Sequence, residues 1–420
     1  MKLSSDFFKK NRKKIFDKME NGSALILSSG TNYIESGDED FDFDVDKCFY
    51  YLTGINQSEV NLVLIKKDNK EEEYLFIEKN DPVRVRWVGA KLYPNEAKEL
   101  SGIEKIRFNN EFMDSLMYLI DHKINNLYLN LERDKAHRYC HNYCYSKEIS
   151  DKFFNKKVID AYPIIVDARF VKEKEEIEKI QEAIDLTKVG VEKLMSEARP
   201  GIHEYELEAH FDYVLKTSGQ IKHSFKTIAA SGKNATILHY VDNNSILKDG
   251  DLILFDLGNE SDFYISDISR TFPVNGKFTE RQKEVYEEVL NVNKKCIEFL
   301  KPGITRTEYN DYAKKLLASA CKRLGLIKED SELTKYYWHG IGHSIGLDTH
   351  DPMSDYGGVI KNGSLFTVEP GLYIEEENIG IRIEDDVVVT DKGTIVLSKD
   401  IIKEVKDIEK YMKEHNKYVK

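Results

Sequence analysis

Four carboxylates and one imidazole in the C-terminal half of the chain lie in short segments that are otherwise apolar or rich in glycine. They are Asp256, Asp267, His343, Glu369 and Glu384. A solvated surface charge is unusual in such surroundings, and a buried charge is costly unless it is paired or bound to a cation. We therefore expect a fold in which these five residues hold two divalent cations side by side, because two cations that share a water molecule can hydrolyse substrates at neutral pH.

The two aspartates of this set are predicted to meet across a β-hairpin. Residues 251–256 predict a strand in which Asp256 shares one face with apolar residues at every second position. Residues 263–272 predict the returning strand, which carries Asp267. Side by side, the two carboxylates would repel, and without a cation one of them would be pushed to protonate. A bound cation removes that penalty, whereas Glu260, between the two strands, is expected to have only a structural role.

Three of the eleven histidines of the chain, His339, His343 and His350, fall within twelve residues. Three glycines in the same run argue against a long helix, so this is not the two-histidine helix of zinc proteases. The glycines let the backbone approach a site closely, and imidazole suits either metal ligation or proton transfer. A single histidine is more often a core residue than a ligand, but three in one glycine-rich run indicate a functional site.

The last two carboxylates of the set lie in apolar segments near the C-terminus. Glu369 follows an apolar run, and Glu384 alternates with Arg382 on one face of a predicted strand whose other face carries Ile381 and Ile383. An acidic turn would not explain a carboxylate in the middle of an apolar strand. We therefore interpret Glu384 as part of the metal-binding set.

The donor set also indicates which metals fit. Four carboxylates supply the charge that neutralises two divalent cations. A carboxylate-rich set with one imidazole suits harder ions such as Mn²⁺, with Co²⁺ or Zn²⁺ as alternatives. No thiolate belongs to the set, which disfavours a structural zinc site.

The composition excludes several other classes of protein. Hydrophobic residues make up 41% of the 420 residues and the net charge is −12, so a sizeable core is possible and no nucleic-acid partner is expected. No stretch approaches the apolar length of a membrane span, so no membrane partner is expected either. Five cysteines scattered over the chain do not form a disulfide framework. A reduced, cytoplasmic protein is therefore expected.

Two domains are predicted along the chain. Strand-like and helix-like runs alternate over residues 1–168, which indicates an α/β domain. A charged run then opens a long amphipathic helix near residue 172, and strand pairs alternate with helices over residues 169–420, which indicates an α+β domain. Further helices of this second domain are expected at about 203–217, 280–300 and 307–324.

A second group of potential ligands, His137, Cys140, His141 and Cys144, lies along one face of a predicted helix. Such a short helical stretch offers poor tetrahedral geometry, so a zinc site is not favoured there. The tyrosines around the group favour packing or an interface instead.

The segments around the five potential ligands resemble the pita-bread metallopeptidases, in particular aminopeptidase P and its relative prolidase. In the C-terminal half, the segments that carry this resemblance are residues 237–240, 254–258, 266–273, 339–351, 367–373 and 380–385. Residues 49–54 and 86–89 look like the creatinase-type N-terminal domain of aminopeptidase P. The resemblance implies a creatinase-like α/β domain over residues 1–168 and a pita-bread catalytic domain over residues 169–420.

The same resemblance implies how the metals are held. Asp267 and Glu384 are expected to bridge the two metals. Asp256 is expected to bind one of them, and His343 and Glu369 the other. The water or hydroxide between the metals is expected to attack the scissile carbonyl, and Glu369 is expected to carry the proton.

Further roles follow from the resemblance for residues around the metals. His239 and His350 are expected to hold the substrate and to stabilise the tetrahedral intermediate by hydrogen bonds. His339 and Arg382 are expected to line the pocket for the proline after the cut, with Tyr373 in support. The stretch between Glu369 and Glu384 is shorter than in many aminopeptidases P, which bears on the preferred substrate length.

The implied activity is that of an aminopeptidase acting on peptides whose second residue is proline. The alternative is a prolidase that cleaves only Xaa-Pro dipeptides, because both enzymes use the same metal chemistry. A non-enzymatic binding module of the same fold is disfavoured, since such proteins lose metal ligands. A homodimer or homotetramer is expected from the resemblance.

Overall fold

The computed structural model describes residues 2–132, 141–354 and 358–419. The chain divides into two compact units, Met1–Arg169 and Phe170–Lys420. The division falls in the last turn of helix α7 (Tyr162–Phe170).

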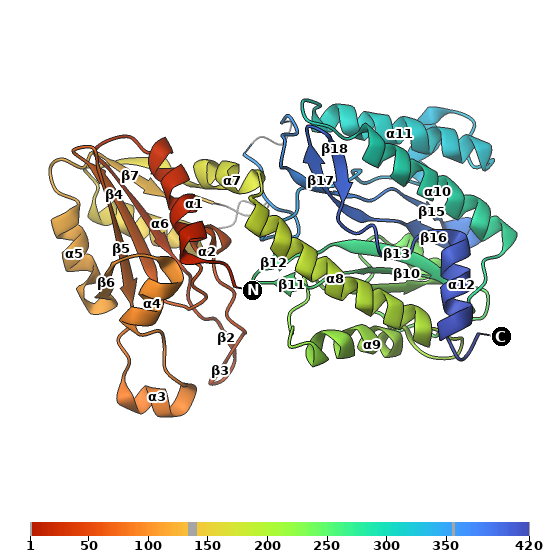
Figure 1. Cartoon of the computed structure of the whole chain (residues 1–420), viewed down its shortest axis with the longest axis horizontal. Coiled ribbons are helices and arrows are strands. Elements are labelled where there is room, and N and C mark those ends of the chain that lie inside the picture. The colour runs from red at the N-terminus through yellow and green to blue at the C-terminus, as the bar shows by residue number, and fades with distance from the viewer. Residues whose placement is uncertain (1, 133–140, 355–357, 420) are drawn as a thin grey trace. The chain divides into compact units, whose positions relative to one another are not determined.

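A six-stranded mixed sheet forms the centre of the N-terminal unit, with the strand order β6-β5-β4-β1-β7-β8. Its strands are β1 (Ser23–Ser28), β4 (Asn61–Lys67), β5 (Lys70–Ile77), β6 (Lys105–Phe108), β7 (Asn126–Leu129) and β8 (Lys157–Asp160). The other elements of the unit are α1 (Ser5–Lys18), β2 (Ile34–Ser36), β3 (Glu39–Asp40), α2 (Lys47–Thr53), α3 (Pro82–Val88), α4 (Pro94–Ser101), η1 (Asn109–Glu111), α5 (Phe112–Leu119) and α6 (His141–Lys152). Helices flank this sheet (Figure 1), so the predicted α/β class is confirmed.

Local sequence explains how the central hairpin of this sheet forms. Every residue of β1 is buried, as expected for a strand covered on both faces. Strands β4 and β5 are joined by Asp68 and Asn69, whose φ angles of 52° and 61° suit the tight turns of two-residue hairpins. The turn is therefore two residues long, and β5 begins at Lys70.

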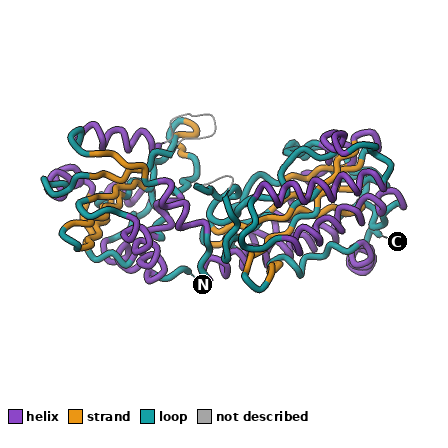
Figure 2. Tube along the Cα trace, turned by 90° about the horizontal axis from the view of Figure 1, so that it is seen from above, coloured by secondary structure: helices purple, strands orange, loops and turns teal. Residues whose placement is uncertain are grey.

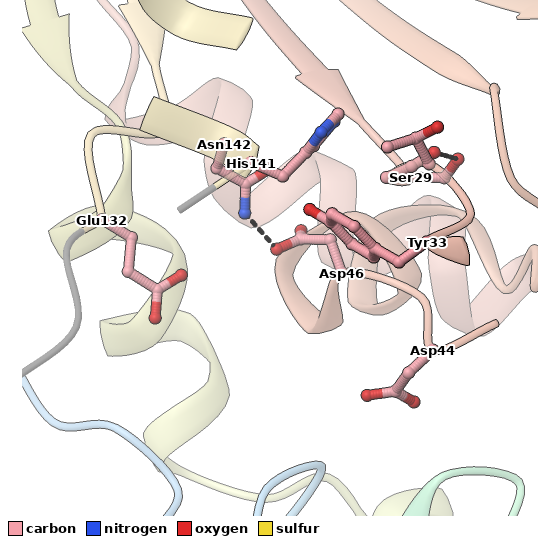
Figure 3. Close-up of a pocket in the computed structure, with 9 residues that line it drawn as sticks. Ser29, Tyr33, Asp44, Asp46, Glu132, His141 and Asn142 are labelled. Carbon is pink, nitrogen blue, oxygen red and sulfur yellow. Dashed lines mark hydrogen bonds between the residues drawn. The ribbon is translucent and has the colours of Figure 1, made fainter. Parts of the chain in front are cut away.

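A cavity of about 290 Å³ opens in the N-terminal unit (Figure 3). One acidic residue of its lining, Asp46, has a structural role, because its carboxylate caps helix α2 by accepting the Phe49 N–H at 2.6 Å and also accepts from the Asn142 side chain at 2.6 Å. Of the second group of potential ligands, His137 and Cys140 lie outside the described residues. Cys144 is an exposed free thiol.

The C-terminal unit contains two similar halves, each made of a helix pair and a three-stranded antiparallel sheet. The first sheet has the order β13-β10-β9 and the second the order β14-β17-β18. Helices α8 and α9 pack together beside the first sheet, and α10 and α11 pack together with α10 against the second. Helices and strands run alongside one another in this unit (Figure 2). The predicted α+β class is confirmed.

The elements of the C-terminal unit fall into helices and strands with these bounds. The helices are α8 (Lys174–Glu197), α9 (Glu204–Thr217), η2 (Gly232–Thr236), α10 (Glu280–Phe299), α11 (Arg306–Arg323), η3 (Asp330–Lys335), η4 (Glu375–Glu377) and α12 (Val405–His415). The strands are β9 (Ile228–Ser231), β10 (Leu252–Leu257), β11 (Glu260–Ser261), β12 (Tyr264–Ile265), β13 (Ile268–Pro273), β14 (Leu365–Val368), β15 (Gly371–Ile374), β16 (Ile379–Arg382), β17 (Asp385–Thr390) and β18 (Gly393–Val396).

The helix ends follow from capping residues in the sequence. Thr279 accepts the Gln282 N–H before α10, and the Gln282 side chain accepts the Thr279 N–H in return. Thr305 and Glu308 repeat this arrangement before α11. Helices α9, α10 and α11 end within one residue of the bounds expected from the sequence.

In the parts of the chain that the structure describes, no helix combines the length and the apolar character needed to cross a membrane.

Candidate metal centre

Three of the four carboxylates lie where one strand ends and the next begins. Asp267 lies between β12 and β13, Glu369 between β14 and β15, and Glu384 between β16 and β17. Asp256 alone lies within a strand, β10, opposite Ser269 of β13. The continuous strands predicted through Asp267 and Glu384 are therefore wrong. Outside a ladder a side chain is free of the strict alternation of strand faces, so the breaks allow carboxylates from different hairpins to turn toward one point.

The structure brings four of the five predicted ligands into direct proximity. Ligand atoms of Asp267, His343 and Glu384 all lie within 4.8 Å of one another. The Nε2 atom of His343 is 3.5 Å from an Asp267 oxygen and 3.6 Å from an oxygen of Glu369. Within the described parts of the chain, this is the one group of three or more such residues with metal-binding geometry.

The fifth predicted ligand, Asp256, is held at the cluster by Arg382. The Arg382 guanidinium donates to one Asp256 oxygen at 2.6 Å, to the Ser269 hydroxyl at 2.7 Å and to the Tyr373 hydroxyl at 3.2 Å. Ser269 in turn donates to Glu384 at 2.7 Å. Arg382 therefore places a positive charge beside the carboxylates. Its position in the sequence does not reveal the contact with Asp256.

The glycine-rich histidine loop is held against β14 by backbone hydrogen bonds. The N–H of Thr367 donates to the His343 carbonyl at 2.9 Å, and the N–H of Glu369 donates to the Ile341 carbonyl at 2.8 Å. A Cβ atom at Gly342 would lie 2.0 Å from the Thr367 carbonyl oxygen, so only glycine permits this approach. The pairing sets the register that places His343 beside Glu369.

Burial and mutual repulsion dominate the electrostatics of the cluster. Burial and the neighbouring carboxylates raise the pKa of Asp267 and of Glu384 well above their usual range. Burial, opposed by Arg382 and reinforced by Asp256, raises the pKa of Glu369 to about 8. Burial also lowers the pKa of His343 to about 3, so its imidazole is neutral at pH 7 and has a lone pair for a metal.

These observations fit a pair of hard divalent cations. Four carboxylates converge, and one guanidinium compensates part of their negative charge. The second oxygen of Asp256, Oδ1, is buried without a hydrogen-bond partner. Unpaired buried carboxylate oxygens are costly, and cations would satisfy them. The donor set of oxygens with one neutral imidazole is the chemistry that Mn²⁺ and similar ions accept.

Above about pH 7, where the histidines of the site are mostly neutral in both the folded and the unfolded state, the metal-free protein is expected to lose stability as the pH rises past about 8. Folding raises the pKa of Glu369 from its ordinary value of 4.5 to about 8, so the folded state binds this proton more tightly than the unfolded chain. The resulting stabilisation is complete below 4.5 and disappears as the pH passes 8. We expect the melting temperature of chelator-treated protein to fall by on the order of 5 °C as the pH rises from about 7 past about 8.

Saturating Mn²⁺ should reverse this trend, because the cations replace the protons. The matched control is Glu369→Gln, whose melting temperature should depend less on pH. Identical slopes for the metal-free wild type and Glu369→Gln would contradict the assigned cause.

Of the remaining predicted residues, His339 and Tyr373 form an inner group, and His239 and His350 form an outer, exposed group. His339 and Tyr373 are in contact, with 2.9 Å between Nε2 and the hydroxyl, and burial with the charge of Arg382 lowers the pKa of His339 to about 3. His350 is exposed, with its ring centroid 4.3 Å from that of His343. His239 is also exposed and lies near enough to His339 to contribute to the lowering of the His339 pKa.

A buried carboxylate holds the segment that carries His239, and it is absent from the residues that the sequence predicts for the site. Glu204, at the start of α9, is fully buried and accepts from the backbone and hydroxyl of Ser231, from the Asn234 amide, from the Tyr240 hydroxyl and from the Ser245 N–H, at 2.6–3.1 Å. Helix-capping sequence near Glu204 gives no sign of this role, because its partners are 27 to 41 residues away.

The segment that carries His350 is held by a buried ion pair. Lys172 Nζ lies 2.7 Å from Asp351 Oδ2, and both side chains are 1% exposed. Asp351 also accepts the Asp348 N–H at 3.3 Å, and its own N–H donates to the Ser344 carbonyl at 2.9 Å. The loop between His343 and His350 is thereby closed on itself.

The short connection between Glu369 and Glu384 is a hairpin whose acidic tip is anchored on three sides. Glu375 pairs with Lys233 at 2.9 Å, Glu376 with Lys335 at 3.2 Å, and Glu377 with Arg281 at 2.7 Å. Asn378 completes the turn in the left-handed region, with φ of 52°.

Comparison with known proteins gives matches over most of the chain. Residues 178–391 match the family model described as metallopeptidase family M24, and residues 8–128 match the one described as aminopeptidase P, N-terminal domain. The Xaa-Pro aminopeptidase of Haemophilus influenzae is 33% identical over 412 residues, which cover 93% of this chain and 94% of that protein.

Solved structures resemble the whole chain as well. An unconfirmed aminopeptidase P from Bacillus anthracis is 45% identical, with a TM-score of 0.96 over 99% of this chain and 100% of that one. The low-pH form of aminopeptidase P from Escherichia coli is 30% identical, with a TM-score of 0.92 over 99% of this chain and 100% of that one. Another structure of the E. coli enzyme is described as zinc-substituted and in complex with product.

Proposed function

The chain belongs to metallopeptidase family M24 and carries the N-terminal domain of aminopeptidase P, and from this we propose that it removes the first residue of peptides whose second residue is proline. It is a metalloaminopeptidase with a pita-bread catalytic domain. The observation that carries the proposal is the convergence of Asp267, Glu384 and the neutral His343 within 4.8 Å, beside Glu369 and Asp256.

We propose that these five residues would hold the two cations, four of them through carboxylate oxygens and His343 through an imidazole nitrogen. When bound, the cations supply an activated water molecule at neutral pH and polarise the scissile carbonyl. His343 supplies a neutral nitrogen ligand. Glu369 accepts on a carboxylate oxygen the proton that the attacking water loses, and it returns this proton to the proline nitrogen as the bond between that nitrogen and the carbonyl carbon breaks.

The surrounding residues orient the substrate in this proposal. His239 and His350, both exposed at the site, donate hydrogen bonds to the peptide and to the oxygen that gains charge during attack. His339 and Tyr373 face the proline ring, and Arg382 holds both Asp256 and Tyr373 in place.

Proline gives a physical reason for a dedicated enzyme. The Xaa-Pro bond is a tertiary amide without an N–H, and its cis form is far more populated than that of other peptide bonds. A general peptidase that relies on that N–H or on a trans bond handles it poorly. A site that recognises the proline ring by direct contact does not need the backbone N–H that proline lacks.

Other features are proposed on narrower grounds. We propose Mn²⁺ as the native metal because oxygen donors dominate the set, and the zinc-substituted E. coli structure shows that this relative also accepts zinc. A homodimer or homotetramer and a cytoplasmic location stay predictions of the sequence.

Product analysis by mass spectrometry tests the substrate. The protein is stripped of metal, restored with Mn²⁺ and given an Xaa-Pro dipeptide, an Xaa-Pro-Yaa tripeptide and a proline-free tripeptide. Release of the first residue from the Xaa-Pro-Yaa peptide, with the proline-free peptide intact, is the expected result. Cleavage of the dipeptide alone would make the protein a prolidase, and no Mn²⁺-dependent cleavage would reject the proposal.

A further inference from the structure

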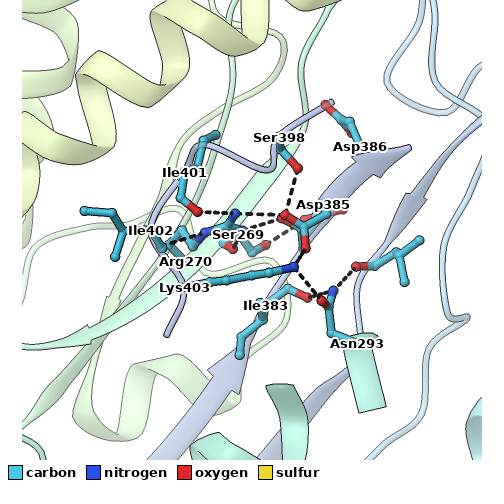
Figure 4. A network of polar contacts seen from close by, with 12 residues as sticks. Ser269, Arg270, Asn293, Ile383, Asp385, Asp386, Ser398, Ile401, Ile402 and Lys403 are labelled. Carbon is cyan, nitrogen blue, oxygen red and sulfur yellow. Dashed lines mark hydrogen bonds and ion pairs between the residues drawn. The ribbon is translucent and has the colours of Figure 1, made fainter. Parts of the chain in front are cut away.

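One buried amide links the backbone segments that precede two of the proposed ligands. Asn293 of α10 is fully buried, and its Nδ2 donates to the Val368 carbonyl at 3.0 Å and to the Ile383 carbonyl at 3.2 Å (Figure 4). Val368 directly precedes Glu369, and Ile383 directly precedes Glu384. Both donor hydrogens of the side chain are thus used on the two segments that must converge for a metal site.

The orientation of this amide is fixed by its partners. Nδ2 faces two carbonyl acceptors, while Oδ1 of Asn293 accepts from the Lys403 ammonium group at 2.9 Å. A rotated amide would point its oxygen at two other oxygens and its nitrogen at a cation. The side chain therefore has one satisfied arrangement.

A buried ionic network contacts the oxygen of the Asn293 amide through Lys403. Lys403 also pairs with Asp385, whose other oxygen pairs with Arg270 at 2.9 Å and accepts from the Ser398 hydroxyl at 2.7 Å. The Arg270 guanidinium also donates to the backbone carbonyl of Glu384. Arg270 and Asp385 are both fully buried. The network thus runs from Asn293 back to the chain at Glu384.

The two ligand-bearing segments meet at a gap between two ladders. Val368 pairs with Asp385 at the end of the β14–β17 ladder, Gly371 pairs with Arg382 in the β15–β16 ladder, and the proposed ligands lie between these pairs. Glu369 and Glu384 both stand at strand breaks, outside any ladder, and their carboxylates repel each other and those of Asp256 and Asp267. Unless the backbone of these two segments is fixed, repulsion between the carboxylates would move the ligands apart before a metal binds. A preorganised site avoids that rearrangement and binds more tightly.

We propose that Asn293 is a positioning residue that sets the separation between Glu369 and Glu384 and thereby the affinity of the dinuclear site. This inference rests on the proposed metal centre but not on the identity of the peptide substrate. Supporting residues around metal ligands typically change metal affinity about 10- to 100-fold when they are replaced.

The chain offers a matched control in Asn416. Its Nδ2 donates to the carbonyls of Met195 and Ala198 at 2.9 and 2.7 Å, and its Oδ1 accepts the Tyr418 N–H at 2.9 Å. Asn416 is 2% exposed and belongs to the same unit as Asn293. It makes the same bonds to two backbone carbonyls, but none of its partners adjoins a proposed ligand.

The test compares Asn293→Leu with Asn416→Leu by calorimetric titration of the metal-free proteins with Mn²⁺. Both variants should melt at lower temperature than the wild type, since each orphans two buried carbonyl groups. Only Asn293→Leu should weaken the weaker of the two Mn²⁺ binding steps, by about tenfold or more. It should also reduce the electron paramagnetic resonance signal of spin-coupled Mn²⁺ pairs at equal metal concentration.

Unchanged Mn²⁺ affinity in folded Asn293→Leu, or an equal loss in Asn416→Leu, would overturn the inference. Should Asn293→Leu not fold, Asn293→Asp takes its place, because it keeps the size and the contact with Lys403 but lacks the two-donor amide. A wild type that binds no Mn²⁺ would reject the metal centre and this inference together. A wild type that binds Mn²⁺ but cleaves no Xaa-Pro peptide would reject only the substrate.

Discussion

Replacing Glu384 with glutamine is expected to lower the rate of Xaa-Pro cleavage by about 10³-fold or more, because an amide removes a charge from the proposed metal centre while keeping the size of the side chain. The amide oxygen can still accept the Ser269 hydroxyl, which donates to Glu384 at 2.7 Å in the wild type, so the fold should persist. Asp267→Asn should have the same effect. Metal analysis after dialysis should find fewer than two Mn²⁺ per chain in both variants.

Glu260→Gln is the matched control for these substitutions. Glu260 lies only four residues after Asp256, in β11, and the sequence predicts a structural role for it. Its variant should keep wild-type turnover and two Mn²⁺ per chain. Undiminished cleavage in folded Glu384→Gln or Asp267→Asn would remove these residues from the metal centre.

Replacing Arg270 with methionine is expected to destabilise the C-terminal unit by about 3–5 kcal/mol, the usual consequence of breaking a buried ion pair. Arg270 and Asp385 are fully buried 2.9 Å apart, and the guanidinium also donates to backbone carbonyls of Ser269, Ile401 and Ile402. Burial opposes ionisation of Asp385, and Arg270 and Lys403 hold its pKa below the usual range, so the loss of Arg270 leaves a buried carboxylate with less positive charge to compensate it. Calorimetry should show the melting temperature of this unit falling by about 10 °C.

Arg323→Met provides the comparison on the protein surface. Arg323 also makes a two-point contact with a carboxylate, Glu288, at 2.6–2.7 Å, but its side chain is 53% exposed. An exposed pair contributes about 0–1 kcal/mol, so the melting temperature should move by about 3 °C or less. Equal shifts for the two arginines would show that burial does not determine the strength of the Arg270 pair.

The sequence predicts the broad organisation of the chain because local signals are strong there. Alternating apolar residues mark β1, and the Thr279 and Gln282 side chains mark the start of α10 where the structure has it. The five potential ligands are recognisable because charged residues inside apolar or glycine-rich segments need a reason to be there. These signals lie within a few residues of each other, where pattern reasoning works.

The parts that the sequence could not predict depend on partners far away in the chain. The breaks at Asp267 and Glu384 look like continuous strands, because the alternation of apolar residues carries on through them. The contact between Arg382 and Asp256 spans 126 positions. Asn293 resembles any polar residue of an amphipathic helix, since its carbonyl partners lie 75 and 90 positions away. Only tertiary structure reveals what these side chains touch.

The most direct measurement of the central claim is a stepwise titration of the metal-free protein with Mn²⁺, in which bound metal and cleavage of an Xaa-Pro-Yaa peptide are followed together. A site built from Asp256, Asp267, His343, Glu369 and Glu384 should bind two Mn²⁺ per chain, and cleavage should rise with occupancy and level off when both are bound. Full cleavage by the metal-free protein, or two bound Mn²⁺ with no cleavage of the peptide, would contradict the account.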